Sequence, residues 1–291
     1  MNDQNKQSMY KLFRDLSNVQ GIARMTIMSL HCFIESIRQL KCAREQIVPL
    51  YTELARAIKV SEPKIIPLIH LLMLFEEEME KTLTPDMDPE QIRQKAIENL
   101  ENKIMLFKSN AARVTEHGLK YVEDGDVIIV HSVSSVVINI LVSARKKAHK
   151  TFKVIILEHN PERTRQTVQA MRDADIEHIV APAYNLSHHI EGANKMFVGA
   201  MSVTSDLKIV APTGTAGTVS LCHLNNISVH LFGNTLHYSQ RDSTEQLIYE
   251  EQTKTRSANI DFYVTTHSHD LVSLDLIDHI ITEKGETRKA S

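Results

Sequence analysis

Apolar residues recur at three- and four-residue steps through roughly the first 120 positions, and this spacing predicts helices. The run from Ile92 to Ala111 shows it most clearly, and Asp88 and Pro89 before it suit a helix cap and first turn. Glycine, which disfavours helix interiors, is scarce here. Helices are expected at residues 9–19, 22–39, 43–58, 63–82 and 88–120. We therefore expect residues 1–123 to form an all-helical N-terminal domain.

The pattern changes at Asp124, where short apolar runs alternate with helical spacing. The run VIIV at 127–130 has strand length and predicts a strand buried on both faces. Strands are expected at 127–130, 153–157, 178–181, 195–198, 207–211, 228–232 and 262–264. Helices are expected at 134–150, 162–174, 184–191, near 271–283 and in a segment ending at 225. The polar stretch 241–259 is expected to be a mobile loop. This alternation predicts an α/β fold, with a Rossmann-like, doubly wound parallel sheet in a second domain, residues 124–291.

Composition narrows the class of protein. Apolar residues make up 42% of the chain, enough for a sizeable core, and the formal net charge of −3 gives no basic surface for nucleic acid. Three cysteines without a C-x-x-C pair indicate a reducing compartment and no zinc site of that type. The polar N-terminus lacks the apolar core of a signal peptide, and the most apolar run, residues 65–75, is too short to span a membrane. We expect a cytoplasmic protein that needs no cofactor or metal.

The carboxyl ends of parallel strands are where ligands bind in such sheets, so they are the first place to seek chemistry. The first strand is followed by four polar residues: His131, Ser132, Ser134 and Ser135. Hydroxyls and free backbone N–H groups at a helix start suit an anion. Ordinary helix capping by Ser134 or Ser135 is the favoured alternative.

Two other strand ends carry weaker signals. Met201 follows Gly-Ala and can neither take a proton nor hold a cation, so packing is its expected role. The turn Thr213, Gly214 and Thr215 enters a helix and could cradle phosphate, but it lacks the Gly-Lys-Ser/Thr ending of a P-loop. A phosphate site and a simple tight turn are equally good interpretations of it.

Histidines and a cysteine invite a metal or nucleophile interpretation. His188 and His189 are adjacent, and His267 and His269 flank a serine, yet no convincing cluster of acidic or thiol ligands joins them, although an aspartate follows His269. Solvated or partly buried imidazoles are the favoured interpretation. Cys222 lies within an apolar helical pattern and is expected to be buried and inert.

At these strand ends the sequence resembles a family that unites the alpha, beta and delta subunits of translation initiation factor 2B with two isomerases. The isomerases act on methylthioribose-1-phosphate and ribose-1,5-bisphosphate. The resemblance covers roughly residues 125–285 and rests on five pieces in order: GDVIIVHSVSSVVINIL (125–141), FKVIILEHNPE (152–162), ANKMFVGAMSV (193–203), the 213–215 turn and IDFYVTTHSHDLVSLDLIDHIITEKG (260–285).

The resemblance implies an absence of catalysis. The isomerases of the family use a cysteine after the first strand and an aspartate after Gly-Ala, where this chain has Ser132 and Met201. They also carry Asn-Lys where this chain has Ala211 and Pro212. Moving a proton between sugar carbons needs ionisable groups with tuned pKa values, and neither replacement supplies one. The factor subunits have lost the same groups, so the chain resembles them better.

The implied function is a regulatory, assembly subunit. Its partners would be itself or related subunits, through the Rossmann-like domain, and a GTP-binding initiation factor. A pocket derived from the isomerase site would take a sugar phosphate or nucleotide, and Arg24 matches a basic residue that the isomerases present to substrate. The chain also departs from the subunits, with Thr265-Thr266-His267 where Thr-Pro-Pro is usual and Gly233-Asn-Thr-Leu-His237 where an aromatic-lysine pair is typical.

Alternatives remain open at this stage. One is an isomerase with displaced catalytic residues, for which His131, Glu158 and His237 are candidates. Another is a stand-alone sensor of a phosphorylated ligand. Because a parallel sheet is covered on both faces, we also expect apolar groups near residues 193–232 that a partner covers.

Overall fold

The computed structural model describes residues 20–60, 64–131, 134–246, 248–257 and 260–287. Packing divides the chain into two compact units between Ala112 and Arg113, inside a long helix. The domain boundary expected at residues 123–124 stays a prediction. The helix expected at residues 9–19 lies outside the described residues.

Unit 1 is helical, as expected. Its helices are α2 (Ile22–Gln39), α3 (Arg44–Val60), α4 (Ile66–Thr82) and the first part of α5 (Pro89–Gly118). The most apolar run of the chain forms the first part of α4 and is largely buried: Leu72 and Phe75 are fully covered, whereas Met73 is exposed. Helix α5 begins as expected, because Asp88 accepts a hydrogen bond from the Gln91 amide at 2.8 Å and Gln91 accepts one from the Asp88 amide at 2.9 Å.

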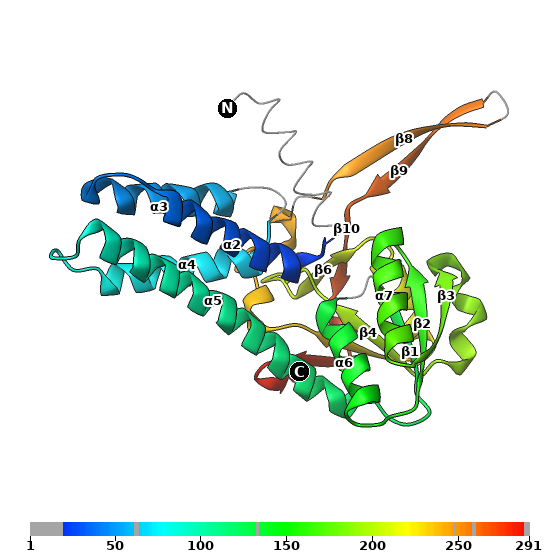
Figure 1. Cartoon of the computed structure of the whole chain (residues 1–291). Helices are drawn as coiled ribbons and strands as arrows, with labels where there is room; N and C mark the ends of the chain where they lie inside the picture. Colours follow the sequence, from blue (N-terminus) through cyan, green and yellow to red (C-terminus); the bar gives the residue numbers. More distant parts are fainter. Residues whose placement is uncertain (1–19, 61–63, 132–133, 247, 258–259, 288–291) are drawn as a thin grey trace. The chain divides into compact units, whose positions relative to one another are not determined.

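A seven-stranded sheet organises unit 2 (Figure 1). Its order is β12 (Gly285–Thr287), β11 (His279–Thr282), β7 (Ser228–Phe232), β4 (Lys195–Gly199), β1 (Val127–His131), β2 (Lys153–Glu158) and β3 (Glu177–Pro182). All neighbouring strands are parallel except β12, which pairs antiparallel with β11. The strand order reverses at β1 and β4, which is the switch point where such sheets bind ligands. The predicted doubly wound α/β fold is confirmed.

Both faces of this sheet are covered because its strands are apolar on both sides. Helices α6 (Ser135–Lys146) and α7 (Pro161–Asp173) pack on the face that carries Ile128 and Val130. On the other face Ile129 packs in a core with α8 (Thr215–Leu224) and the short helix η2 (Ala183–His188). The remaining short helices are η1 (Leu119–Tyr121), η3 (Ile190–Gly192), η4 (Thr235–His237), η5 (Ser243–Glu245) and η6 (Leu274–Leu276).

Three expectations need correction in the second half of unit 2. The helix expected near residues 271–283 is wrong: the segment forms β10 (His269–Ser273), η6 and β11. Strand β6 (Lys208–Pro212) is not in the parallel sheet, since it pairs antiparallel with β5 (Ser202–Val203) and β10. The polar stretch expected to be a loop supplies β8 (Glu250–Ser257), which pairs with β9 (Ile260–His267) in a hairpin. Backbone pairing with distant strands decides the first two cases, and pairing with the adjacent strand β9 decides the third.

Candidate functional site

His131 ends β1 at the switch point and is buried. Its Nδ1 lies 3.0 Å from Thr215 Oγ1, and the Thr215 hydroxyl donates to the Pro212 carbonyl at 2.6 Å. Because that hydroxyl proton is already used, His131 Nδ1 donates to Thr215, and its Nε2 carries the lone pair. Burial, followed by the charges of His159 and Arg163, lowers the pKa of His131 to about 4. The imidazole is therefore neutral at pH 7 and can accept a proton.

Gly214 allows the close approach of the α8 turn to this ring. Its φ is 94°, in the left-handed region that favours glycine, and a Cβ there would lie 3.1 Å from His131 Nε2. The neighbouring Thr213 donates its hydroxyl to the His267 carbonyl. The turn is thus fixed by both backbone conformation and side-chain bonds.

The start of α8 already has an anion, supplied by the protein itself. Asp270 on β10 accepts hydrogen bonds through Oδ2 from the Gly214 and Ala216 amides, each at 2.9 Å. A carboxylate satisfies the free amides and the dipole of a helix N-terminus in the way that a phosphate would. Phosphate binding at residues 213–215 stays a prediction, and a phosphate at these two amides would have to displace Asp270.

Two residues after β2 extend the site, and the sequence interpretation missed them both. The rings of His131 and His159 meet edge to face with centroids 5.5 Å apart. Partial burial and the Arg163 guanidinium lower the pKa of His159, whereas Asp270 raises it. Arg163 stands in the first turn of α7, where desolvation lowers its own pKa. The strand-end rule that found His131 would have found both, because they follow the carboxyl end of the adjacent parallel strand.

His269 completes this group of side chains. It is buried at the start of β10, next to Asp270 in the chain. Burial lowers its pKa to about 4, with Asp270 acting in the opposite direction and His159 adding to the lowering. The site therefore combines neutral imidazoles, one guanidinium and one carboxylate. Such a set can bind an anionic oxygen ligand and can accept a proton.

The serines after β1 have structural roles where they are described. Ser134 is the N-cap of α6, and its Oγ accepts a hydrogen bond from the Val137 amide at 3.2 Å. Gly199 at the end of β4 lies so close that a Cβ there would be 2.5 Å from Ser134 Cβ. Ser135 begins α6 and is exposed, and Ser132 lies outside the described residues. The capping interpretation is confirmed for Ser134.

The remaining candidate residues from the sequence lie on several different elements. Met201 is half-buried after β4, and its amide donates to the Val210 carbonyl at 2.9 Å. Arg24 is exposed in the first turn of α2, in unit 1. Glu158 is exposed at the end of β2. His237 is held by Asn234, whose Oδ1 lies 2.9 Å from Nδ1. Cys222 is buried, as expected, and burial raises the pKa of its thiol to about 12.

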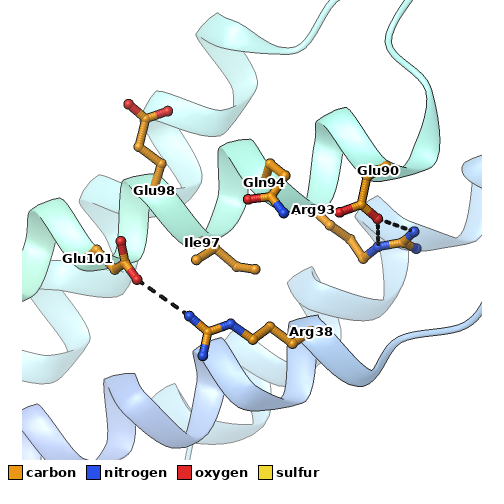
Figure 2. Close-up of a pocket in the computed structure, with 7 residues that line it drawn as sticks. All are labelled: Arg38, Glu90, Arg93, Gln94, Ile97, Glu98 and Glu101. Carbon is orange, nitrogen blue, oxygen red and sulfur yellow. Dashed lines mark hydrogen bonds and ion pairs between the residues drawn. The ribbon is translucent and has the colours of Figure 1, made fainter.

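A separate pocket of about 340 Å³ lies in unit 1 between α2 and α5 (Figure 2). Its lining is mostly charged: Arg38, Glu90, Arg93, Gln94, Ile97, Glu98 and Glu101. The charges pair with one another, Arg93 with Glu90 at 2.7 Å and Arg38 with Glu101 at 3.6 Å. Internal pairing of this kind is typical of a solvated surface.

Metal and membrane interpretations gain no support from the part of the chain that the structure describes. Within it, no three His, Cys, Asp or Glu side chains are grouped so as to hold a metal ion. No helix among the same residues is both long and apolar enough to cross a bilayer.

Comparison with known proteins places this chain in a family. The model of the initiation factor 2 subunit family matches residues 18–289. The chain is 25% identical over 226 residues to translation initiation factor eIF2B subunit delta of Dictyostelium discoideum, covering 70% of this chain but only 36% of that protein. It is 26% identical over 252 residues to ribose 1,5-bisphosphate isomerase of Pyrococcus furiosus, covering 81% of this chain and 76% of the isomerase.

Solved structures agree on the fold. The translation initiation factor eIF-2B of Pyrococcus horikoshii superposes with a TM-score of 0.81 at 20% identity, covering 100% of this chain and 98% of that one. A chain of the tetrameric eIF2B-beta2-delta2 complex from C. thermophilum gives a TM-score of 0.70 at 14% identity, with coverages of 99% and 93%. Because the family model spans nearly the whole chain, this protein belongs to the initiation factor 2 subunit family, which is related both to translation-factor subunits and to sugar-phosphate isomerases.

Proposed function

We propose that this chain is a non-catalytic regulatory and assembly subunit in translation initiation, and that the group of side chains around His131 and Arg163 binds a phosphorylated small molecule. The observation that carries the proposal is Met201, a thioether in the position after β4 where the resemblance to the isomerases calls for a carboxylate. Ser132 stands where their cysteine is expected. Neither side chain can exchange a proton with a sugar carbon near neutral pH, so the site would recognise a ligand without converting it.

The chemistry of the side chains around His131 supports a phosphorylated ligand. Arg163 supplies a permanent positive charge, and this charge helps to lower the pKa values of the neutral rings of His131 and His159. A phosphate group bound there would gain charge-assisted hydrogen bonds from the guanidinium. It would also neutralise the charge that now opposes protonation of the two imidazoles. Sugar phosphates and nucleotides both present this group.

Calorimetric titration with ribose 1,5-bisphosphate tests the ligand proposal. Arg163→Met is expected to weaken binding at least tenfold, because one charge-assisted hydrogen bond accounts for about 1.5–3 kcal/mol. Arg165→Met is the matched control: Arg165 lies on the same helix, is exposed and pairs with Glu162 at 2.6 Å. Equal affinities of the two variants would remove Arg163 from the site, and no binding to the wild type would overturn the ligand proposal.

Assembly is the second part of the proposal. A solved relative is described as a tetrameric beta2-delta2 complex, and we extend that behaviour to this chain. Leu207 and Leu224 lie in the region where a covered apolar surface is expected, and both are exposed. The partners we propose are copies of this chain or related subunits, through unit 2, and a GTP-binding initiation factor. Native mass spectrometry of the protein drawn from its own cells would identify them, and a lone monomer would contradict this part.

A second candidate function, sugar-phosphate isomerisation with displaced residues, is favoured by one observation. The Nε2 of neutral His131 carries a lone pair and the His159 ring packs beside it, although the lowered pKa of His131 makes it a weak base. Turnover of methylthioribose-1-phosphate that disappears in His131→Ala would favour this candidate. We expect no turnover by the wild type.

A further inference from the structure

The β8–β9 hairpin is a two-stranded sheet that extends away from the rest of unit 2 (Figure 1). The two strands pair along eight residue pairs, from Glu250 opposite His267 to Ser257 opposite Ile260. Every residue of β9 is exposed. Isolated two-stranded hairpins are marginal in water, and three or more strands are usually needed for stability. We therefore expect a further strand to pair with the hairpin.

Its two faces differ in chemistry. Because facing residues of antiparallel strands share a side, Thr253 and Val264 lie on one face with Thr255 and Phe262. The exposed fractions of Phe262 and Val264 are 44% and 43%, large for apolar side chains. The opposite face, called the polar face, carries most of the charged residues of the hairpin, together with Tyr263.

Charges on the polar face of β8 change sign along the strand. Glu250 stands at the start of β8, and Lys254 and Arg256 stand toward its end. Arg256 lies opposite Asp261, with Nε and Oδ1 3.8 Å apart, and Glu250 lies opposite His267, with Oε2 and Nε2 4.0 Å apart. A strand with one sign at each end is complementary to itself when a second copy runs antiparallel.

We propose that β8 pairs antiparallel with β8 of a second copy of this chain, so that the two hairpins form one four-stranded sheet. The inference rests on the proposed assembly role and names the surface that serves it. Symmetry restricts the pairing, because a twofold axis perpendicular to the sheet brings together residues on the same face. An axis through Thr253 places Thr253 opposite its own copy and Glu250 opposite Arg256.

This register produces favourable rows on both faces. On the polar face, one row of side chains crosses the four strands. It contains Asp261 and Arg256 of one copy, followed by Glu250 and His267 of the second copy. The charges of the first three alternate in sign. Cross-strand pairs of opposite charge stabilise a sheet. On the other face, the two Thr253–Val264 pairs adjoin at the axis and join the apolar surfaces of the hairpins. The partner is a second copy because the same strand supplies both halves of the charge pattern.

Cysteine cross-linking tests the register directly. In a Cys32→Ser, Cys42→Ser background, Thr253→Cys is expected to give a disulfide-linked dimer with copper-phenanthroline, since directly opposed residues have Cα atoms about 4.5–5.5 Å apart. Thr255→Cys is the matched control on the same face. Its own copy would lie four residues away, about 14 Å, and should not cross-link. Equal cross-linking of the two variants, or none by Thr253→Cys, overturns the register.

Charge reversal tests the pairing without cysteine. Sedimentation equilibrium is expected to show that Arg256→Glu raises the dimer dissociation constant about tenfold, while Arg165→Glu on α7 leaves it within twofold of wild type. The double variant Glu250→Arg, Arg256→Glu restores opposite charges between the two copies and should recover part of the affinity, since it also sets like charges opposite Asp261 within each hairpin. A dimer that is insensitive to Arg256→Glu, or no recovery in the double variant, overturns the hairpin pairing alone. A wild type that stays monomeric overturns the pairing together with self-assembly.

Discussion

Removing the Asp270 carboxylate should open the start of α8 to an external anion. In Asp270→Ala the Gly214 and Ala216 amides, each now 2.9 Å from Oδ2, lose their acceptor. A donor left without a partner costs about 1–3 kcal/mol when it is buried. The loss of negative charge at a helix N-terminus adds about 0.3–1 kcal/mol. Since Gly214 and Ala216 are half-buried and water can reach them, we expect a loss of about 2–3 kcal/mol in the free energy of unfolding.

Thermal unfolding measures this loss. For a domain of about 150–250 residues each kcal/mol shifts the midpoint by about 2–4 °C, so the expected fall is about 4–12 °C. Inorganic phosphate or sulfate should reverse more of the fall in Asp270→Ala than it adds to the wild type, because the anion replaces the carboxylate. An anion at about 100 times its dissociation constant adds ~2.7 kcal/mol.

The control is Asp173→Ala, which removes an exposed carboxylate from the end of α7. Its midpoint should stay within about 1 °C of wild type, as for most surface substitutions. An unchanged midpoint in Asp270→Ala, or no extra stabilisation of that variant by phosphate, would refute the reasoning.

Three other predictions concern buried groups. Burial lowers the pKa of His230 to about 3, so below pH 6.5 the unfolded chain binds a proton that the native state does not, and the free energy of unfolding decreases as the pH falls. In urea titrations His230→Phe should remove up to about 2 kcal/mol of the loss between pH 7 and pH 5, and an unchanged loss would contradict this prediction. Gly214→Ala should lower the free energy of unfolding by about 1–2 kcal/mol, because the residue has a positive φ. Gly217 lies inside α8 with open space around it, so Gly217→Ala should raise that free energy by about 0.5–1 kcal/mol. Equal thermal unfolding midpoints of the two variants would contradict this prediction. Iodoacetamide should modify exposed Cys32 at least about 100-fold faster than buried Cys222 by mass spectrometry, and comparable rates would show that α8 opens readily.

The sequence predicts the parallel sheet well because its strands are buried on both faces. Runs such as 127–130 and 153–157 are apolar without a break, so strand length and flanking turns identify them without knowledge of their partners. Glycine scarcity and three- to four-residue spacing served equally well for the helices of unit 1. These signals are local, and local signals are what a single sequence contains.

The sequence interpretation missed the strands whose only mark is pairing with another strand. Leu271, Leu274, Ile277 and Ile281 recur at steps of three and four residues, yet β10 pairs with β6 and β11 with β7, and these ladders override the spacing. Strand β8 is polar, so only its pairing with β9 marks it as a strand.

The candidate site divides in the same way. His131, Ser134 and the 213–215 turn follow strand ends and could be found by position alone. Asp270 could not, because its role is to bind the Gly214 amide, more than 50 residues earlier in the chain. Nothing in the sequence joins the two positions, and only the β6–β10 pairing brings them together.

The central claim is that the site around His131 and Arg163 binds a phosphorylated ligand without converting it. Carbon-13 NMR of labelled ribose 1,5-bisphosphate mixed with the pure wild-type protein detects both binding and conversion of the ligand in one sample. We predict broadened or shifted sugar signals that show binding, with no ketose carbonyl above the level of a protein-free control. Ketose formation that depends on the protein and is lost in His131→Ala would contradict the account.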